Sequence, residues 1–490
     1  MINNLLKKYK MSGEDAAQLI KDSMNVAMSG YSAAGYPKAV VRALENRKKT
    51  GDLSTINLVT GANVPFIDEH LASVNLINKR APMIAHKNLR NLVNKGDVKY
   101  IEQQMNKMPR LLQSNSFGKI DVLIVEAAGF SEDGDLIPSN SIGMLNHLIE
   151  ASDKIIIEIN KGLHPSIKSL HDIYIPKKFP NTEPIPLIKS NDRIASNKIA
   201  FDHNKIIGIV ENYEKEISTQ LYEANPISTK IAQNLFNFLE IEYKSLKSNL
   251  PPIQTGFGAI SDSITNGFNL TNFKDINFFC GGIGEAAIKL LEKGKAKSLS
   301  TGGLGLNENV ESILSSFPDL KNSLVIRNGD ITNSSEIINR LSLIALNTGI
   351  EIDIYGNVNS SHVTGNRVIN GIGGGANFAQ NSGLSIILIP SISKKGAISN
   401  IVPMVSHQDI CEHDVDVIIT ENGVADVRGL DDIERAKKII KLCSSPEYKD
   451  SLISYFLKSL KEVGGHHPQM PFEAFSWYKR LKDNGSMKEG

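Results

Sequence analysis

Two glycines in the segment "QTGFGAISD", residues 254–262, have a spacing that could serve a ligand. Gly256 and Gly258 permit tight backbone turns and let a ligand approach the main chain closely. A helix that starts directly after them would direct its N-terminal N–H groups towards an anion. The third glycine of a dinucleotide-binding fingerprint is absent, so an ordinary strand-to-helix turn stays open as the alternative.

A second glycine group is denser, because Gly371, Gly373, Gly374 and Gly375 fall within one short segment. Consecutive N–H groups in such a loop can form a concave site for a carbonyl oxygen or a phosphate. Asparagine and glycine also gather in plain turns. Four glycines so close together exceed what one turn needs, and we therefore favour a ligand loop, to which Asn357 could add side-chain donors and acceptors.

Two further polar segments carry groups that could bind an anion or a metal. Lys394 and Lys395 follow an apolar run and could pair with a phosphate or a carboxylate, although an exposed loop tip has the same composition. The spacing in "SHQDICEHD" fits neither H-x-x-x-H nor a zinc knuckle. We expect a polar loop and no metal site at its candidate ligands, which are His407, Asp409, Cys411, Glu412 and His413.

The elements that must position these loops alternate between short apolar runs and amphipathic patterns. The runs are rich in isoleucine and valine and are bounded by turn residues, which predicts buried strands over residues 121–129, 154–160, 205–211, 384–390 and 414–423. The amphipathic patterns predict helices over residues 13–28, 141–152, 214–240, 284–293, 333–347 and 446–461. This alternation is typical of α/β domains with largely parallel sheets and helices on both faces.

The domain boundary is expected near residue 220. The long polar region 211–252 contains no strand pattern, and a new strand–turn–helix sequence begins after it. We predict an N-terminal α/β domain over residues 1–220 and a C-terminal α/β domain over residues 221–490, each of a size that suits an open α/β sheet.

The composition excludes several classes of protein. The chain has 490 residues and a formal net charge of +1, which gives no support to nucleic-acid or membrane-surface binding. Its three cysteines form no C-x-x-C pair and cannot build a disulfide framework. We find no signal-peptide pattern and no apolar run near the roughly 18 residues of a membrane helix. These features predict a cytoplasmic protein that contacts neither nucleic acid nor a membrane.

Several long motifs resemble the acetyl-CoA hydrolase/transferase family of class I coenzyme A transferases. They run in order over most of the chain and include "SGYSAAGYPKAV" (29–40), "DLIPSNSIG" (135–143), "KGLHPSIKSLHDIY" (161–174), "IYGNVNSSHVTGNRVINGIGGGANF" (354–378) and "KKGAISNIVPMVSHQDICEHDVDVIITENGVADVRGL" (394–430). The resemblance implies two open, largely parallel-sheet α/β domains of the CoA-transferase type, with the active site between them. It also suggests a homodimer.

The resemblance implies covalent catalysis by a glutamate. Its carboxylate attacks an acyl-CoA thioester to give a mixed anhydride, and the released CoA thiolate converts this to a glutamyl-CoA thioester, while backbone N–H groups stabilise each oxyanion. A small carboxylate then takes the CoA, or water intercepts an intermediate. Acyl-CoA is therefore a substrate, and no tightly bound cofactor is expected. The positions that resemble the family's CoA contacts are Gly256, Phe257, Gly258, Ala259, Ile260, Ile350, Asn357, Gly374 and Lys394.

The chain departs from the family at the nucleophile. In "FFCGGIGEAAIKLLEKG", residues 278–294, alignment of the strand start and the helix end places Gly281 where the glutamate belongs. The Gly-Gly-Ile sequence there resembles the citrate lyase alpha subunit. Glu285, four residues later, could act as a relocated nucleophile or a base, or could simply occupy the first turn of a helix, where the dipole favours a carboxylate.

We therefore expect an acyl-CoA:carboxylate CoA-transferase or an acetyl-CoA hydrolase acting on small acyl-CoA thioesters. One alternative is an acyl-carrier-thiol transferase of the citrate lyase alpha type, which would need a carrier-protein partner. The other is a CoA-thioester-binding protein that has lost catalysis.

Overall fold

The computed structural model of the chain describes residues 2–84, 86–216, 224–244, 250–256, 258–317 and 320–489. Phe257, a predicted CoA contact, lies outside these residues. The chain groups into two compact units: unit 1 comprises Met1–Gln220 and Asp275–Leu341, and unit 2 comprises Leu221–Lys274 and Ser342–Gly490. The division into domains 1–220 and 221–490 stays a prediction.

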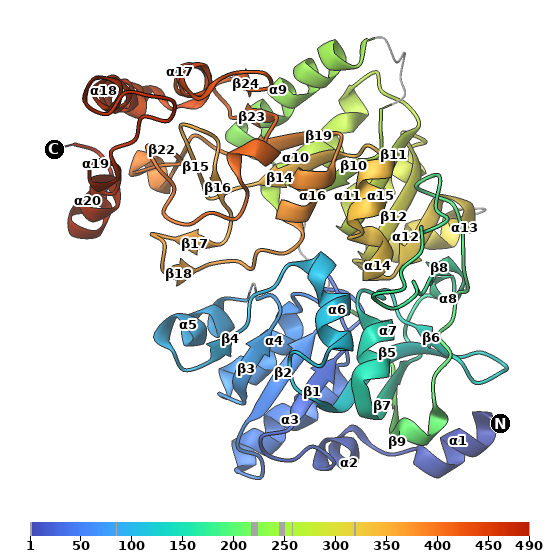
Figure 1. The fold of residues 1–490 in the computed structure, drawn as a ribbon. Coiled ribbons are helices and arrows are strands. Elements are labelled where there is room, and N and C mark those ends of the chain that lie inside the picture. Colours follow the sequence, from blue (N-terminus) through green and yellow to red (C-terminus); the bar gives the residue numbers. More distant parts are fainter. Residues whose placement is uncertain are drawn as a thin grey trace. The chain divides into compact units, whose positions relative to one another are not determined.

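The first sheet of unit 1 has the strand order β4-β3-β2-β1-β5-β7-β9, with β6 paired to β5 (Figure 1). All pairs along this order are parallel, and β6 is antiparallel. The bounds are β1 (Asn25–Met28), β2 (Ile56–Thr60), β3 (Ile77–Ala81), β4 (Lys99–Tyr100), β5 (Ile120–Phe130), β6 (Leu136–Pro138), β7 (Ser152–Asn160) and β9 (Ile206–Asn212). The strands predicted over 121–129, 154–160 and 205–211 are confirmed by β5, β7 and β9.

Two predicted helices each contain a strand, and in the helix predicted over residues 214–240, of which residues 217–223 lie outside the described part, α9 begins only at Pro226. The pattern over residues 13–28 forms helix α2 only as far as Gln18, and Asn25–Met28 become β1 between β2 and β5. The pattern over residues 333–347 forms α15 (Ser335–Arg340) and then strand β14 (Ile344–Thr348). Short buried apolar runs have no decisive period of their own, so the neighbouring strands decide their conformation.

Unit 1 contains four more strands, β11 (Ile276–Ile283), β12 (Ala296–Leu304), β13 (Leu324–Arg327) and β8 (His171–Asp172). They pair in this order and in parallel, with Gly282 of β11 opposite Gly303 of β12. The carboxyl ends of β11, β12 and β13 therefore meet at one edge.

The strands of unit 2 follow the order β24-β23-β19-β14-β10. The pairs from β10 to β23 are parallel, and β24 is antiparallel to β23. A smaller sheet has the order β16-β15-β22. The bounds are β10 (Ile253–Thr255), β15 (Glu351–Asp353), β16 (Val358–Asn359), β19 (Leu384–Leu388), β22 (Ile401–Val402), β23 (Val417–Ile419) and β24 (Val424–Asp426). Strands were predicted over 384–390 and 414–423, and they are confirmed by β19 and β23. The predicted α/β class with largely parallel sheets is confirmed.

The helices of unit 1 are α1 (Ile2–Tyr9), α2 (Gly13–Gln18), α3 (Ala39–Thr50), α4 (Pro65–Ser73), α5 (Lys87–Lys95), α6 (Met108–Gln113), α7 (Leu145–Ala151), α8 (Ile167–Leu170), α11 (Glu285–Glu292), α12 (Glu308–Ser316), α13 (Leu320–Ser323), α14 (Gly329–Thr332) and α15. Those of unit 2 are α9 (Pro226–Glu242), α10 (Ala259–Gly267), α16 (Gly375–Asn381), α17 (Asp432–Cys443), α18 (Pro446–Glu462), α19 (Pro471–Ala474) and α20 (Ser476–Asn484). In the part of the chain that the structure describes, none of these helices has the length and apolar character needed to cross a membrane.

A buried ion pair attaches the short edge strand β8 to β13. The side chains of Asp172 and Arg327 are both 0% exposed, and an Arg327 guanidinium nitrogen contacts Asp172 Oδ2. Burial lowers the pKa of Arg327 to about 10, although the charge of Asp172 opposes this. Arg327 Nε also donates to Ser300 Oγ over 2.7 Å, so the guanidinium is held between β12, β13 and β8.

We predict that Asp172→Ala destabilises the protein by about 3–5 kcal/mol, because it leaves the Arg327 charge buried without a partner. Urea unfolding followed by circular dichroism measures the loss. The matched control is Asp133→Ala, which removes an exposed aspartate paired with Lys198 and should leave the midpoint unchanged. Equal midpoints for the two variants would contradict this account of the pair.

Candidate active site

The position that lacks the family glutamate lies at the carboxyl end of β11. Strand β11 ends at Ile283, Gly284 is the N-cap of α11, and Glu285 is the first residue of that helix. The sequence had predicted this strand, turn and helix start. A Cβ atom added at Gly281 would lie 3.6 Å from the hydroxyl oxygen of Tyr31, which is ordinary van der Waals contact. Tyr31 is thus the side chain that faces the vacant position.

Tyr31 fits into unit 1 because glycines surround it. A Cβ atom at Gly302 would approach the Tyr31 ring to 2.8 Å, one at Gly143 to 2.4 Å, and one at Gly303 would approach the Tyr31 carbonyl oxygen to 2.5 Å. Asn333 Nδ2 donates a hydrogen bond to the phenol oxygen over 2.5 Å. Burial raises the pKa of Tyr31 to about 12, so the phenol is neutral at physiological pH.

The loop that carries Tyr31 has an uncommon backbone. Ser32 and Ala33 have φ values of 51° and 63°, a left-handed conformation that is strained for residues with a Cβ. Tyr31 and Ala34 hold the turn closed, since each backbone N–H donates to the other's carbonyl oxygen, over 2.9 and 3.1 Å. Ser141 Oγ donates to the Ala34 carbonyl over 2.8 Å and links the loop to the segment before α7.

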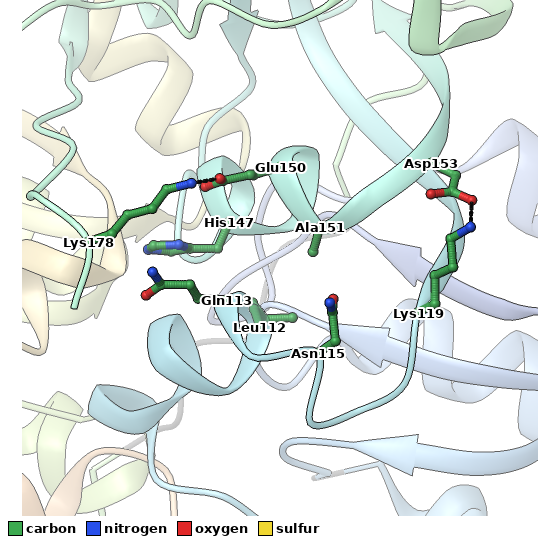
Figure 2. A pocket seen from close by; sticks show the side chains of 9 residues that line it. All are labelled: Leu112, Gln113, Asn115, Lys119, His147, Glu150, Ala151, Asp153 and Lys178. Carbon is green, nitrogen blue, oxygen red and sulfur yellow. Dashed lines mark hydrogen bonds and ion pairs between the residues drawn. The ribbon is translucent and has the colours of Figure 1, made fainter. Parts of the chain in front are cut away.

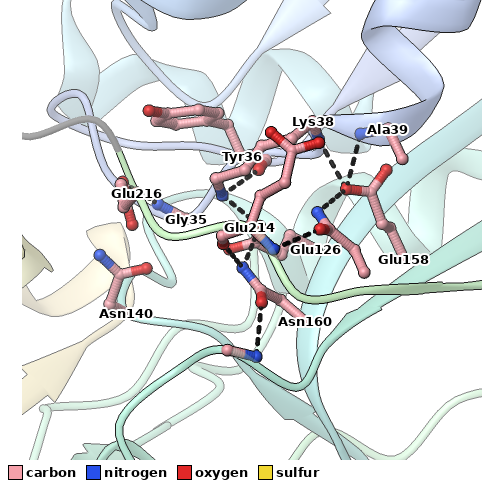
Figure 3. Close-up of polar contacts among 12 residues, drawn as sticks. Gly35, Tyr36, Lys38, Ala39, Glu126, Asn140, Glu158, Asn160, Glu214 and Glu216 are labelled. Atoms are coloured by element: carbon pink, nitrogen blue, oxygen red, sulfur yellow. Dashed lines mark hydrogen bonds and ion pairs between the residues drawn. The ribbon is translucent and has the colours of Figure 1, made fainter.

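A buried charge cluster anchors the end of this loop (Figure 3). The Lys38 ammonium contacts a carboxylate oxygen of Glu126, on β5, and both side chains are at most 1% exposed. Lys38 Nζ also donates to the Tyr36 carbonyl over 3.0 Å. Burial lowers the pKa of Lys38, but the neighbouring carboxylates, Glu126 first, raise it by more, so the lysine stays charged.

A second carboxylate of the cluster, Glu158 on β7, fixes the start of α3. It accepts hydrogen bonds from the backbone N–H groups of Lys38, Ala39 and Val40, over 2.6 to 3.0 Å. These donors are the unsatisfied N–H groups of the first helical turn, where a carboxylate is favoured by the helix dipole. Asn212 Nδ2 adds a fourth donor over 2.7 Å.

A third carboxylate, Glu216, reaches the same loop from the segment after β9. Its Oε1 accepts a hydrogen bond from the Gly35 N–H over 3.0 Å. Burial raises the pKa of Glu216 to about 8; the charge of Lys38 lowers it and the charge of Glu126 raises it. Glu216 is therefore largely protonated at neutral pH.

Glu285, the predicted replacement for the nucleophile, is held by three donors. Lys289 Nζ lies 2.5 Å from Oε1, Asn309 Nδ2 donates to Oε1 over 2.9 Å, and Asn307 Nδ2 donates to Oε2 over 2.6 Å. Burial alone would raise the pKa of Glu285, but these three hydrogen bonds outweigh it and the pKa is lowered. Asn307 also caps α12 through Val310 N, so this geometry favours a structural role.

In unit 2 the predicted CoA-binding segments gather at the carboxyl ends of parallel strands. The loop after β10 leads to Gly258, the N-cap of α10, whose φ of 121° is a conformation that favours glycine, and then to Ala259 and Ile260 in the helix. Gly256 precedes it, and an added Cβ there would meet only Ser261 Oγ at 3.8 Å. In open α/β sheets, ligands bind at this edge.

The glycine cluster of residues 371–375 lies near the carboxyl end of β14, the strand that pairs with β10. Gly374 is the N-cap of α16, and Asn347, near the end of β14, donates to the Gly375 carbonyl over 3.3 Å. Ile350 follows β14 directly, and its N–H donates to the Asn359 carbonyl over 2.7 Å. The structure thus places the segments of Gly256, Gly374 and Ile350 around neighbouring strands.

The side chain of Asn357 already forms hydrogen bonds within the protein, whereas that of Lys394 is exposed to solvent. Asn357 Nδ2 donates to the buried carboxylate of Asp353 over 3.2 Å, and its Oδ1 accepts from Gln408 Nε2 over 2.7 Å. Lys394 is exposed, directly follows the short strand β20 (Ile392–Ser393), and has a left-handed φ of 46° beside Lys395 at 56°. The ammonium of Lys394 is therefore accessible to a ligand, whereas the Asn357 amide stabilises the turn between Asp353 and Asn357.

A polar group at Cys411, Glu412 and His413 and a pocket in unit 1 are two other candidate sites, and neither shows a catalytic arrangement of the predicted site residues. Cys411, Glu412 and His413 have ligand atoms within 4.8 Å of one another, but burial raises the pKa of the Cys411 thiol, which disfavours the thiolate that binds a metal.

A pocket in unit 1 is lined partly by paired charges, such as Lys119 and Asp153 at 2.5 Å (Figure 2). None of the predicted site residues lines this pocket.

Two family models match the chain. The acetyl-CoA hydrolase/transferase N-terminal domain matches residues 3–211, and the acetyl-CoA hydrolase/transferase C-terminal domain matches residues 311–456. A succinyl-CoA:acetate CoA-transferase of Clostridium kluyveri is 38% identical over 99% of this chain and 92% of its own. A propanoyl-CoA:succinate CoA transferase of Escherichia coli is 34% identical over 98% of each chain. An acetyl-CoA hydrolase of Neurospora crassa is 34% identical over 99% of this chain and 96% of its own.

Solved structures share the fold at lower identity. The RipA structure from Yersinia pestis has a TM-score of 0.74 and 20% identity, and covers 94% of this chain and 99% of its own. A putative alpha subunit of citrate lyase from Streptococcus mutans, in complex with citrate, has a TM-score of 0.61 and 18% identity. It covers 93% of this chain and 86% of its own.

The sequence analysis assigned no chemistry to Tyr31 or to the charge cluster. The motif "SGYSAAGYPKAV" was noted only for its resemblance. One signal was available, because Glu126 and Glu158 interrupt apolar strand patterns, "DVLIVEAAG" and "KIIIEIN", at buried positions. Charges in buried strands are rarely found without a partner.

We predict that Gly281→Ala folds normally, because the added methyl group only touches Tyr31. Gly302→Ala would press on the Tyr31 ring and on the Gly281 carbonyl oxygen, at 2.8 and 2.9 Å, and should cost about 1–3 kcal/mol of stability. Urea unfolding of the two variants measures the difference. A Gly302→Ala protein as stable as Gly281→Ala would contradict the packing described for Tyr31.

We predict that Glu285→Gln lowers stability at pH 7 by about 1–3 kcal/mol, because it weakens hydrogen bonds to a charged group. The pKa of Glu285 is lowered from its ordinary value of 4.5 on folding. Its contribution is therefore fully present above that value and is lost as the pH falls through the lower, folded pKa. Unfolding at pH 7 and near pH 4 should show a smaller difference from wild type at the lower pH.

The control for this pH effect is Glu292→Gln, on the exposed side of the same helix. This variant should match wild type at both pH values. A difference between wild type and Glu285→Gln that grows with acid would contradict the hydrogen-bond network.

Proposed function

The chain belongs to the acetyl-CoA hydrolase/transferase family, and we propose that it transfers CoA from small acyl-CoA thioesters to small carboxylates or releases the acyl group to water. The resemblance inferred from the motifs is confirmed by the family models. The observation that carries the proposal is the match over nearly the whole chain to relatives named as CoA-transferases and acetyl-CoA hydrolases.

The loops of unit 2 are proposed to bind the CoA substrate. Gly258 offers a backbone that a ligand can approach closely, and the exposed charge of Lys394 suits a phosphate. The proposed contacts are Gly256, Phe257, Gly258, Ala259, Ile260, Ile350, Asn357, Gly374 and Lys394. The proposed chemistry uses acyl-CoA as a substrate and requires no tightly bound cofactor.

Gly281 provides no carboxylate at the position of the family nucleophile, and this leaves two alternatives to the proposed CoA transfer. Glu285 is the carboxylate nearest in sequence, but its three donors stabilise the charged form and reduce its nucleophilicity. The sequence Gly281-Gly282-Ile283 keeps transfer to a carrier thiol, with a carrier protein as partner, as the second candidate. A CoA-thioester-binding protein without turnover is the third.

Two further parts of the proposal concern the whole molecule. We propose a homodimer, on the basis of the family resemblance. We also propose a cytoplasmic location, because all three cysteines are free and a reducing compartment suits them.

The test is incubation of the full chain with acetyl-CoA, with and without succinate. Chromatography of the CoA esters and a thiol reagent follow the products. We expect succinyl-CoA and acetate when succinate is present, and at most slow thiol release when it is absent. Binding of acetyl-CoA without exchange or thiol release would contradict the enzymatic proposal and favour the binding protein.

A further inference from the structure

Four carboxylates of unit 1 are candidates for the group that Gly281 cannot provide, and they differ in how many donors already hold them. Glu158 has four donors and Glu285 has three. Glu126 contacts the Lys38 ammonium and accepts from Asn160 over 3.2 Å. Each of these three carboxylates is at most 5% exposed.

Glu216 has fewer donors than Glu158 or Glu285, and its hydrogen bonds come from neutral groups, whereas Glu126 contacts the Lys38 ammonium. Glu216 Oε1 accepts one hydrogen bond, from Gly35 N over 3.0 Å. The Glu216 carboxyl forms a second hydrogen bond with the Asn140 side chain, which lies beside it (Figure 3). Asn140 Nδ2 donates to the Leu304 carbonyl over 2.6 Å, which fixes this side chain next to β12. Glu216 is thus held by two neutral partners, the Gly35 N–H and the Asn140 side chain.

The same loop connects Glu216 with the vacant position. Tyr31, at one end of the closed turn, faces Gly281, and Gly35, four residues on, binds the Glu216 carboxyl. Four residues span no more than about 14 Å, and the turn shortens this distance. Asn140 also lies next to β12, because its carbonyl accepts from Leu304 N over 2.8 Å. Glu216 is therefore linked to the strand pair of Gly281 in two ways, through the Tyr31–Gly35 loop and through Asn140, which bonds to β12 next to β11.

We propose that Glu216 supplies the nucleophilic carboxylate that this chain lacks at Gly281, an inference that rests on the proposed function. Its Oε2 attacks the thioester carbonyl carbon, the new C–O bond forms, and the C–S bond breaks with its electron pair leaving on the CoA sulfur. The thiolate then attacks the Glu216 carbonyl carbon, forming a C–S bond and expelling the acyl group as a carboxylate. An acceptor carboxylate reverses both steps.

The surroundings of Glu216 suit such a nucleophile. A carboxyl whose pKa burial raises to about 8 is a stronger base, once ionised, than an ordinary glutamate. It must first lose its proton to solvent, so the ionised fraction grows as the pH rises through about 8. Two charged side chains face it in the cluster: Lys38 favours the ionised form and Glu126 opposes it.

The test compares Glu216→Gln and Glu216→Asp with the matched control Glu214→Gln. Glu214 lies two residues earlier, carries the same side chain, and pairs at the surface with Arg42 over 2.8 Å. We expect Glu216→Gln to lower kcat at least about 100-fold, with melting temperature and acetyl-CoA affinity retained. Glu216→Asp, which withdraws the carboxylate by one methylene group, should also be slow. Glu214→Gln should behave as wild type.

Mass spectrometry identifies the intermediate. Wild-type protein incubated with acetyl-CoA alone should gain the mass of CoA less water, and peptide mapping should place the gain on Glu216. The wild-type kcat should also rise with pH through about 8. Turnover without an adduct, an adduct on Glu285, or full activity of Glu216→Gln would each overturn the inference. Absence of any turnover by wild type would instead refute the proposed function.

Discussion

The buried ammonium group of Lys38 determines which strands and loops of unit 1 are held together around the candidate site. Lys38 is 1% exposed, and a buried charge is tolerated only with an opposite charge and satisfied hydrogen bonds. Glu126 on β5 provides the opposite charge, and Glu158 on β7 binds the backbone of the same residue. One residue therefore fixes the loop end and the start of α3 to two neighbouring strands.

The strained turn depends on this anchor. Ser32 and Ala33 have left-handed φ values at a cost of order 1–3 kcal/mol each, and such residues persist only where their surroundings hold them. Lys38 holds one end of the loop, Ser141 holds its middle, and the glycines around Tyr31 leave room for the ring. The position of the phenol beside Gly281 follows from these three constraints together.

The sequence predicts strands and helices that have a clear hydrophobic pattern of their own. It does not predict elements and sites whose structure depends on residues far away in the chain. The strands β5 and β7 are readable from local pattern alone. Residues Asn25–Met28 and Ile344–Thr348 were assigned to helices, because only their neighbours in the sheet reveal them as strands. Glu216 shows no local signal at all, since its environment is made by Gly35 and Asn140, which are far away in the chain.

The unequal number of donors decides where the cluster keeps a proton. Three buried carboxylates surround a single ammonium, so full ionisation would leave excess negative charge in a medium of low dielectric constant. Glu158 has four N–H donors. Burial raises the pKa of Glu126, and the ammonium of Lys38 opposes this rise. Glu216 has the Gly35 N–H and the Asn140 side chain as partners, and burial raises its pKa to about 8. Burial thus raises the pKa of both Glu126 and Glu216, and the single ammonium of Lys38 opposes the rise at each of them.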